Sequence, residues 1–149
     1  MERSNSQPLR SGIKQSIGGL HALNAMIAKC RNSTRIYGAQ DDLLFCSYLL
    51  GVNGAISAIL TIFPEQCVKQ WEAVITGNIE GAKLIQVRLL PVWQLVISDG
   101  MYFPGRLKAI LITLGRNGGL PRRPILEPST EIVEQLHTAL QHAKLLPDQ

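Results

Sequence analysis

Short apolar runs alternate with helical patterns over the first part of the chain. The runs at 9–16, 34–37 and 55–60 are bounded by turn-forming residues, which predicts three β-strands. Between them, apolar residues recur three or four positions apart over 20–30, and a second helix is predicted over 42–50. This order, with short connections, favours parallel strands joined by crossover helices.

After residue 63 the pattern is helical throughout. The first of these helices is predicted to begin at Pro64 and end at Gly77, and to bury one face with Val68, Trp71, Val74 and Ile75. Further helices are predicted from Asn78, from Arg106 and from Ser129. Asn78 and Ser129 are predicted caps, because their side chains can accept hydrogen bonds from the free amides of a first turn.

The chain is long and apolar enough to fill one core, with 149 residues of which 46% are hydrophobic. We expect a loose leader over 1–8, three β/α units over 9–63 and a helical region over 64–149. No apolar stretch reaches the roughly 18 residues of a membrane span, and the first residues lack the apolar centre of a secretion signal. We therefore expect a soluble, cytoplasmic protein with no membrane partner.

Charge and cysteine usage exclude other classes of function. The net charge is +4, but the basic residues are scattered and aromatic residues are few, so no nucleic-acid partner is expected. The three cysteines contain no Cys-x-x-Cys pair, which favours reduced thiols over a disulfide framework or a zinc site. His137 and His142 are five residues apart on one helix, so they point to different faces. We expect neither a metal nor a cofactor.

Lys14 is the strongest candidate for chemistry. It lies near the end of the first predicted strand, and the chain then turns through Gly18 and Gly19 into a helix. A lysine in this position can point its amine into a cleft, where apolar walls and nearby positive charge favour the neutral, nucleophilic form. The alternative is an ordinary solvated lysine, since most lysines are exposed.

The segment Gly12-Ile13-Lys14-Gln15-Ser16, with Gly18-Gly19-Leu20, resembles the Schiff-base segment of the dihydrodipicolinate synthase and N-acetylneuraminate lyase family of pyruvate-dependent aldolases. Further matches follow in the family's order and at compatible spacing: Asp41-Asp42, Leu50-Gly51-Val52-Asn53-Gly54-Ala55-Ile56-Ser57, Gly77-Asn78 and Arg123-Pro124-Ile125. The resemblance extends over about residues 9–146. A complete (β/α)₈ TIM barrel needs roughly 250 residues, so the resemblance implies an α/β fold with barrel strands six to eight followed by the family's C-terminal helices.

The resemblance also implies roles for individual residues. Lys14 would form a Schiff base with pyruvate or a related 2-oxo acid or sugar acid, in a lyase of the aldolase or dehydratase type. Asp41 and Asp42 would bind the substrate as a carboxylate pair suited to hydroxyl groups. Ile56 and Ser57 would bind it after the third strand, where the family has a main-chain carbonyl close to the lysine and the substrate. From the residues alone, Asp41 is equally a cap for the helix over 42–50, and Ile56 is equally a core residue.

Two groups of the family's active site lie N-terminal to the matched region: the threonine pair that binds the pyruvate carboxylate, and the tyrosine that shuttles protons. Tyr37, Tyr48 and Tyr102 do not match that tyrosine's position. Two hypotheses remain: a truncated Schiff-base lyase with an incomplete active site, and a non-catalytic remnant or assembly subunit. In either case the open strand edge of a partial barrel favours a homo-oligomer or pairing with a complementary chain.

Overall fold

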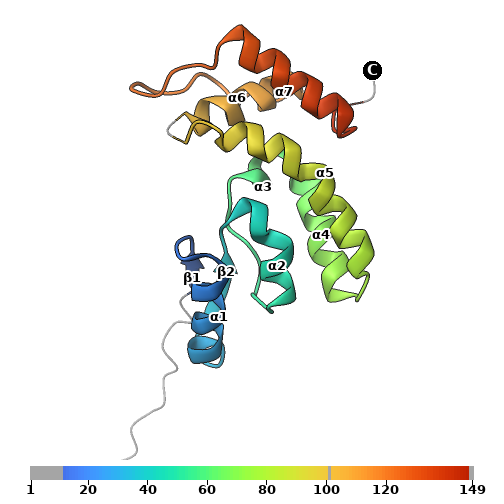
Figure 1. Ribbon diagram of the computed structural model, residues 1–149. Coiled ribbons are helices and arrows are strands. Elements are labelled where there is room, and N and C mark those ends of the chain that lie inside the picture. The colour runs from blue at the N-terminus through green and yellow to red at the C-terminus, as the bar shows by residue number, and fades with distance from the viewer. Residues whose placement is uncertain (1–11, 101, 148–149) are drawn as a thin grey trace, which may run out of the picture.

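The computed structural model describes residues 12–100 and 102–147, in which a small α/β part is followed by a helical part (Figure 1). The α/β part contains, in chain order, β1 (Gly12–Gln15), α1 (Gly19–Cys30), β2 (Arg35–Gly38), the 3₁₀-helix η1 (Asp41–Leu43), α2 (Leu44–Leu49) and α3 (Ile59–Ile62). The helical part contains α4 (Pro64–Ile75), α5 (Ile79–Ile97), α6 (Phe103–Thr113) and α7 (Thr130–His142). The predicted leader over 1–8, and residues 9–11 of the first predicted strand, lie outside the described residues.

β1 and β2 form a parallel pair connected by α1, as predicted. Lys14 lies opposite Tyr37, and successive residues of each strand point to opposite faces of the sheet. On one face Gln15 and Ile36 are 4% and 1% exposed, and the helices α1 and α2 contact β2. We call the other face, which carries Gly12, Lys14, Arg35 and Tyr37, the inner face; Lys14 is exposed on it.

The prediction of a full third strand over 55–60 is wrong. Only Ala55 pairs with the sheet, through a single parallel bridge to Gly38. From Ile59 the chain is helical, and the Asp41 carboxylate caps the start of α3 by accepting a hydrogen bond from the Ile59 amide at 2.6 Å. The described residues therefore hold a two-stranded parallel sheet with a one-residue extension, in a chain that is mostly helical.

The two caps predicted for the helical part are confirmed. The Gly81 amide donates to Asn78 Oδ1 at 3.0 Å at the start of α5, and the Ile132 amide donates to Ser129 Oγ at 3.4 Å at the start of α7. The buried residues of α5 recur at helical spacing: Ala82, Leu89, Val92, Trp93 and Val96. Among the described residues, no helix has both the length and the apolar character needed to cross a bilayer.

The face predicted for α4 is wrong at two positions. Val68 and Ile75 are 53% and 61% exposed, and the buried residues of the helix are Cys67 and Gln70. Gln70 can be buried because its side-chain amide donates to the Ala82 carbonyl at 3.3 Å, and also to the side chain of the neighbouring α5 glutamine. The face of α4 that is turned toward α5 is therefore the one with Gln70, and not the predicted one with Val68 and Ile75.

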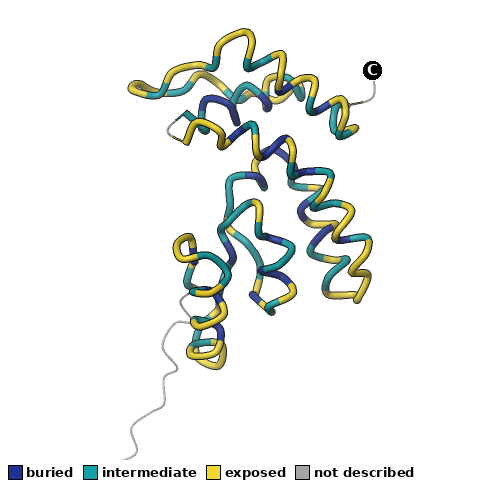
Figure 2. Tube along the Cα trace, viewed as in Figure 1, coloured by how far each residue is buried: buried dark blue, intermediate teal, exposed yellow. Residues whose placement is uncertain are grey.

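A single hydrophobic core joins the two parts of the chain, and its buried segments continue from the sheet into the helices (Figure 2). α5 is central to it, since this helix contacts η1, α2, α4, α6 and α7. The fully or nearly fully buried side chains of the cluster include Leu23, Ile36, Leu44, Ile62, Val92, Ile110, Leu136 and Leu140. The sheet is thus held against the helical part by continuous apolar packing.

Candidate active site

Lys14 lies in the strand, turn and helix context that its sequence predicts. It is followed by Gln15, whose buried side-chain amide donates to the carbonyls of Ile17 and Gly19, the latter at 3.3 Å. Gly18 and Gly19 have φ angles of 84° and 61°, a left-handed conformation that glycine adopts without strain. The Gln15 amide therefore holds the turn in place directly after the lysine.

Ile56 shares the inner face with Lys14. Its amide donates to the Gly38 carbonyl at 2.9 Å, and this hydrogen bond is part of the bridge between Ala55 and Gly38. The alternation around Ala55 places Gly54 and Ile56 on the same face as Lys14. Ile56 is 50% exposed, so the alternative interpretation of its side chain as core packing is wrong.

Asp41 and Ser57 form a second group. The Asp41 carboxylate caps α3 through the Ile59 amide, and the N-cap residue of η1, Gln40, makes no side-chain cap bond. The prediction that Asp41 caps the helix directly following it is therefore wrong: it caps a helix 18 residues further along the chain. Ser57 Oγ is buried and has no hydrogen-bond partner of good geometry among the described residues, but it lies near enough to the Asp41 carboxylate to lower the pKa of that group.

Asp42 differs from Asp41 and Ser57 in being exposed to solvent. Its side chain faces solvent, whereas its main-chain carbonyl accepts a hydrogen bond from the Gln86 side-chain amide at 2.8 Å. Gln86 belongs to α5, so this bond ties η1 to the helical part. Of the adjacent carboxylates, Asp41 is engaged in a cap and Asp42 is exposed.

Burial raises the pKa of Asp41 above its ordinary value of 3.8, because the loss of hydration outweighs the hydrogen bonds that it accepts. A carboxyl group whose pKa is raised by folding binds a proton more tightly in the folded state. Its contribution to stability is therefore fully present below the unfolded pKa and is lost as the pH rises through the folded pKa. Ionised Asp41 thus weakens the fold near neutral pH while still capping α3.

Asp41→Asn and Asp41→Ala are expected to separate these two effects. Asn keeps an oxygen acceptor for the Ile59 amide without the charge, so this variant should be at least as stable as the wild type near neutral pH, with a flatter pH dependence. Ala removes the acceptor and should lower the free energy of unfolding by about 1 kcal/mol. Urea unfolding from about pH 4 to about pH 8 measures both. Equal destabilisation by the two substitutions at neutral pH would contradict the capping role.

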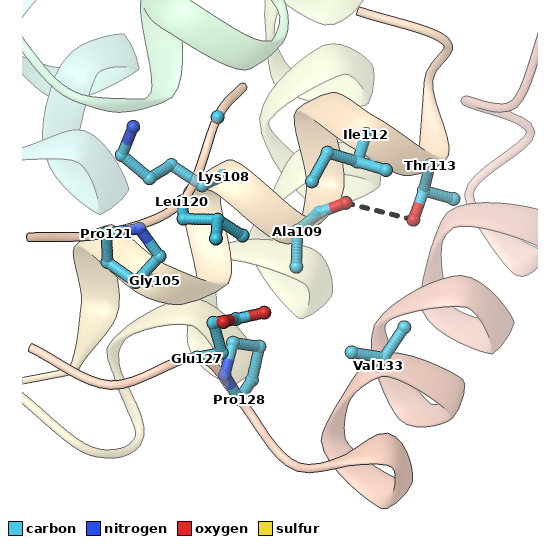
Figure 3. A pocket seen from close by; sticks show the side chains of 11 residues that line it. Gly105, Lys108, Ala109, Ile112, Thr113, Leu120, Pro121, Glu127, Pro128 and Val133 are labelled. Atoms are coloured by element: carbon cyan, nitrogen blue, oxygen red, sulfur yellow. Dashed lines mark hydrogen bonds between the residues drawn. The ribbon is translucent and has the colours of Figure 1, made fainter. Parts of the chain in front are cut away.

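A pocket of about 170 Å³ lies away from these residues, between α6, the loop after it and the start of α7 (Figure 3). The Lys108 ammonium donates to the Gly118 carbonyl at 2.6 Å, and the Thr113 hydroxyl donates to the Ala109 carbonyl at 3.0 Å. The walls of the pocket are mainly apolar and include Ile112, Leu120, Pro121, Pro128 and Val133. None of the predicted site residues lines this pocket.

The described residues contain no group of three His, Cys, Asp or Glu side chains that could hold a metal ion. Cys30, Cys46 and Cys67 are free thiols. Burial raises the pKa of the Cys67 thiol to about 12, which keeps it protonated and unreactive. The nucleophile that the geometry leaves accessible on the inner face is the Lys14 amine.

Tyr37 is an inner-face residue that sequence reasoning missed. It lies directly opposite Lys14 in the parallel register, although the two residues are far apart in sequence. The signal that could have found it is the alternation within β2, where the buried Ile36 fixes the opposite orientation for its neighbour. The structure thus brings Lys14, Tyr37 and Ile56 to the inner face of the sheet. Asp41 and Ser57 lie together at the start of α3.

The sequence model of the Dihydrodipicolinate synthetase family matches residues 6–143 of the chain. The 4-hydroxy-tetrahydrodipicolinate synthase of Archaeoglobus fulgidus is 28% identical over 135 residues, which cover 91% of this chain and 46% of the relative. The enzyme of the same name from Methanopyrus kandleri is 26% identical over 137 residues, which cover 92% of this chain and 45% of the relative. The chain therefore spans about half the length of these relatives.

Solved structures give the same result. A dihydrodipicolinate synthase superposes with a TM-score of 0.80 at 25% identity, covering 91% of this chain and 46% of that structure. The N-acetylneuraminate lyase of Fusobacterium nucleatum superposes with a TM-score of 0.76 at 25% identity, covering 91% and 45%. The fold is thus that of slightly under half of such a TIM barrel, and the resemblance found in the sequence is confirmed. The chain belongs to the dihydrodipicolinate synthetase family.

Proposed function

We propose that this chain provides the Schiff-base lysine of a lyase that acts on pyruvate or a related 2-oxo acid. Members of the family are Schiff-base, pyruvate-dependent lyases. The observation that carries the proposal is the position of Lys14, on the inner face near the end of β1 and directly before a fixed turn. Active sites of TIM barrels are built at this end of the strands.

In the proposed reaction, the neutral amine of Lys14 attacks the keto carbon of the 2-oxo acid, and loss of water gives a protonated imine. The imine withdraws electrons from the adjacent carbon and stabilises the enamine that forms when a carbon–carbon or carbon–oxygen bond breaks. A solvated lysine is mostly an ammonium ion near neutral pH. The site therefore needs walls over the inner face, and we propose that a second copy of the chain supplies them.

The other predicted residues take different parts in this proposal. Asp42 has an exposed carboxylate that can accept hydrogen bonds from substrate hydroxyl groups. The main chain at Ile56 lies on the same face as Lys14 and can contact the substrate there. Asp41 would act on the substrate indirectly, by fixing the loop between β2 and α3 through the cap on Ile59, and Ser57 lies beside it in this loop.

The second candidate function is a non-catalytic assembly subunit or remnant, in which another copy or a complementary chain covers the inner face. The observation that favours it is the exposure of Lys14 and Ile56 on that face. Two strands with a one-residue extension leave unpaired backbone groups at the sheet edge, which can pair with a further strand. In this function the chain contributes surface, and its lysine performs no chemistry.

Trapping with borohydride distinguishes the two functions. The full chain is incubated with pyruvate, treated with borohydride, digested and analysed by mass spectrometry. The expected result is a reduced pyruvate adduct on the peptide that contains Lys14, and none with lactate, which has no keto group. A full-length member of the family serves as the positive control. If that protein is labelled and this chain is not, the assembly function is supported and the lyase proposal is overturned.

A further inference from the structure

We propose that Gln86 is a positioning residue that holds Asp42 at the edge of the candidate active site, so that the Asp42 carboxylate selects 2-oxo acids that carry hydroxyl groups. The inference rests on the proposed Schiff-base function and on the part that it gives to Asp42. β2 ends at Gly38, opposite Gln15, and η1 begins three residues later. Because the strands are parallel, η1 starts at the edge of the sheet near which Lys14 also lies.

Gln86 reaches η1 from the helical part of the chain. Its side-chain amide, on α5, donates to the Asp42 main-chain carbonyl at 2.8 Å, across 44 residues of sequence. The preceding residue, Asp41, is tied to the start of α3 through the Ile59 amide at 2.6 Å. η1 is therefore held from two directions at adjacent residues, while the side chain of Asp42 remains exposed to solvent.

A buried glutamine on α4 fixes the orientation of the Gln86 side chain. Gln70 is 1% exposed, and its amide donates to Gln86 Oε1 at 3.1 Å and to the Ala82 carbonyl at 3.3 Å. Because the oxygen of the Gln86 amide accepts from Gln70, its NH₂ group is left to donate to the Asp42 carbonyl. One chain of hydrogen bonds thus runs from α4 through α5 to η1.

A fixed main chain at Asp42 improves selectivity for hydroxyl groups. The carboxylate can accept hydrogen bonds from several hydroxyl donors. If η1 had to be ordered each time a substrate bound, part of the gain from these bonds would be lost to conformational entropy. Gln86 orders η1 before the substrate arrives. A 2-oxo acid without hydroxyl groups makes no such bonds, so its reaction with Lys14 should not depend on Gln86.

Competition between two 2-oxo acids measures this selectivity. The full chain is incubated with equal amounts of 2-oxo-3-deoxygluconate and of 2-oxohexanoate, which has the same carbon chain without hydroxyl groups. Borohydride reduction and mass spectrometry give the ratio of the two adducts on Lys14, and a pyruvate adduct formed by cleavage of the sugar acid is counted with the sugar acid. Because both acids react with the same folded molecules, a variant that only lowers the folded fraction leaves this ratio unchanged.

Gln86→Leu removes the hydrogen-bond donor and keeps a side chain of similar size. We expect this variant to lower the ratio of sugar-acid adduct to 2-oxohexanoate adduct by about tenfold, because a misplaced carboxylate loses charged hydrogen bonds to the substrate. Its reaction with 2-oxohexanoate should keep the wild-type rate per folded molecule. Gln94→Leu is the matched control, since Gln94 is an exposed glutamine on the same helix; it should keep the wild-type ratio.

A double variant shows whether Gln86 acts through Asp42. Asp42→Ala removes the carboxylate and should lower the ratio at least as far as Gln86→Leu does. Adding Gln86→Leu to Asp42→Ala should lower the ratio no further, because two residues that act through one interaction are not additive. A glutamine that only stabilises the fold would leave the ratio unchanged in every one of these variants.

Each outcome decides between the proposals. A lowered ratio in both single variants, with no further loss in the double variant, supports the inference. An unchanged ratio in either single variant, additive losses in the double variant, or a wild type that does not prefer the sugar acid overturns it and leaves the Schiff-base function standing. A wild-type chain that forms no adduct with pyruvate or with either acid, while a full-length relative does, overturns both.

Discussion

Replacing Lys14 by arginine is expected to abolish the borohydride-trapped pyruvate adduct completely and to leave the stability of the chain unchanged. Arginine preserves the positive charge and most of the length of the side chain. Its guanidinium does not lose its proton in proteins, so no nucleophilic amine is available to attack a ketone. Lys14 is exposed, and exposed substitutions usually change the free energy of unfolding by less than about 0.5 kcal/mol.

A second lysine provides the matched control. Lys69 is an exposed lysine on α4, so Lys69→Arg removes one amine from the chain without touching the inner face. This variant should retain the full adduct, and both variants should unfold at the wild-type urea concentration. An adduct that persists in Lys14→Arg would mean that exposed lysines react without selection. The assignment of Lys14 as the catalytic residue would then be wrong.

The features that could be predicted from the sequence are those decided by neighbouring residues. Asn78 and Ser129 each accept a hydrogen bond from an amide three residues further on, so the caps depend only on a short segment. The buried face of α5 follows from helical spacing over a long window, where one period dominates. β1 and β2 are short, but the turn residues around them delimit them.

The features that the sequence did not predict depend on contacts between distant residues. Residues 55–60 are an apolar run that fits a strand or a buried helix, and the Ile59 amide, where the helix begins, is bonded to the distant Asp41 carboxylate. α4 buries Gln70, whose amide finds an acceptor on α5. A polar residue in a buried position cannot be recognised until its partner has been placed.

The candidate site shows the same division. Lys14 could be found because a strand, a tight turn and a helix surround it in sequence, whereas Tyr37 requires the register between two strands. The register also separates residues that are adjacent in sequence: Ile56 is on the inner face with Lys14, and the next residue, Ser57, has its buried Oγ beside Asp41. A one-residue difference along a strand therefore changes which group a residue joins.

α5 offers a matched pair of leucines that tests whether the chain folds around one core. Leu89 is 3% exposed and belongs to the cluster that extends from α1 to α7, whereas Leu84 on the same helix is 68% exposed. Because α5 contacts both η1 of the α/β part and α7 of the helical part, a cavity at Leu89 weakens the packing between the two. The same cavity cannot form at Leu84.

Leu89→Ala is expected to lower the free energy of unfolding by about 2–5 kcal/mol, through lost burial and the cavity left behind. Leu84→Ala should change it by less than about 0.5 kcal/mol, since its side chain is already in solvent. Urea unfolding followed by circular dichroism and by tryptophan fluorescence measures both, because Trp71 and Trp93 lie in the helical part. With one core, the two signals should coincide in every variant. A separate transition, unaffected by Leu89→Ala, would show that the sheet and the helices fold independently.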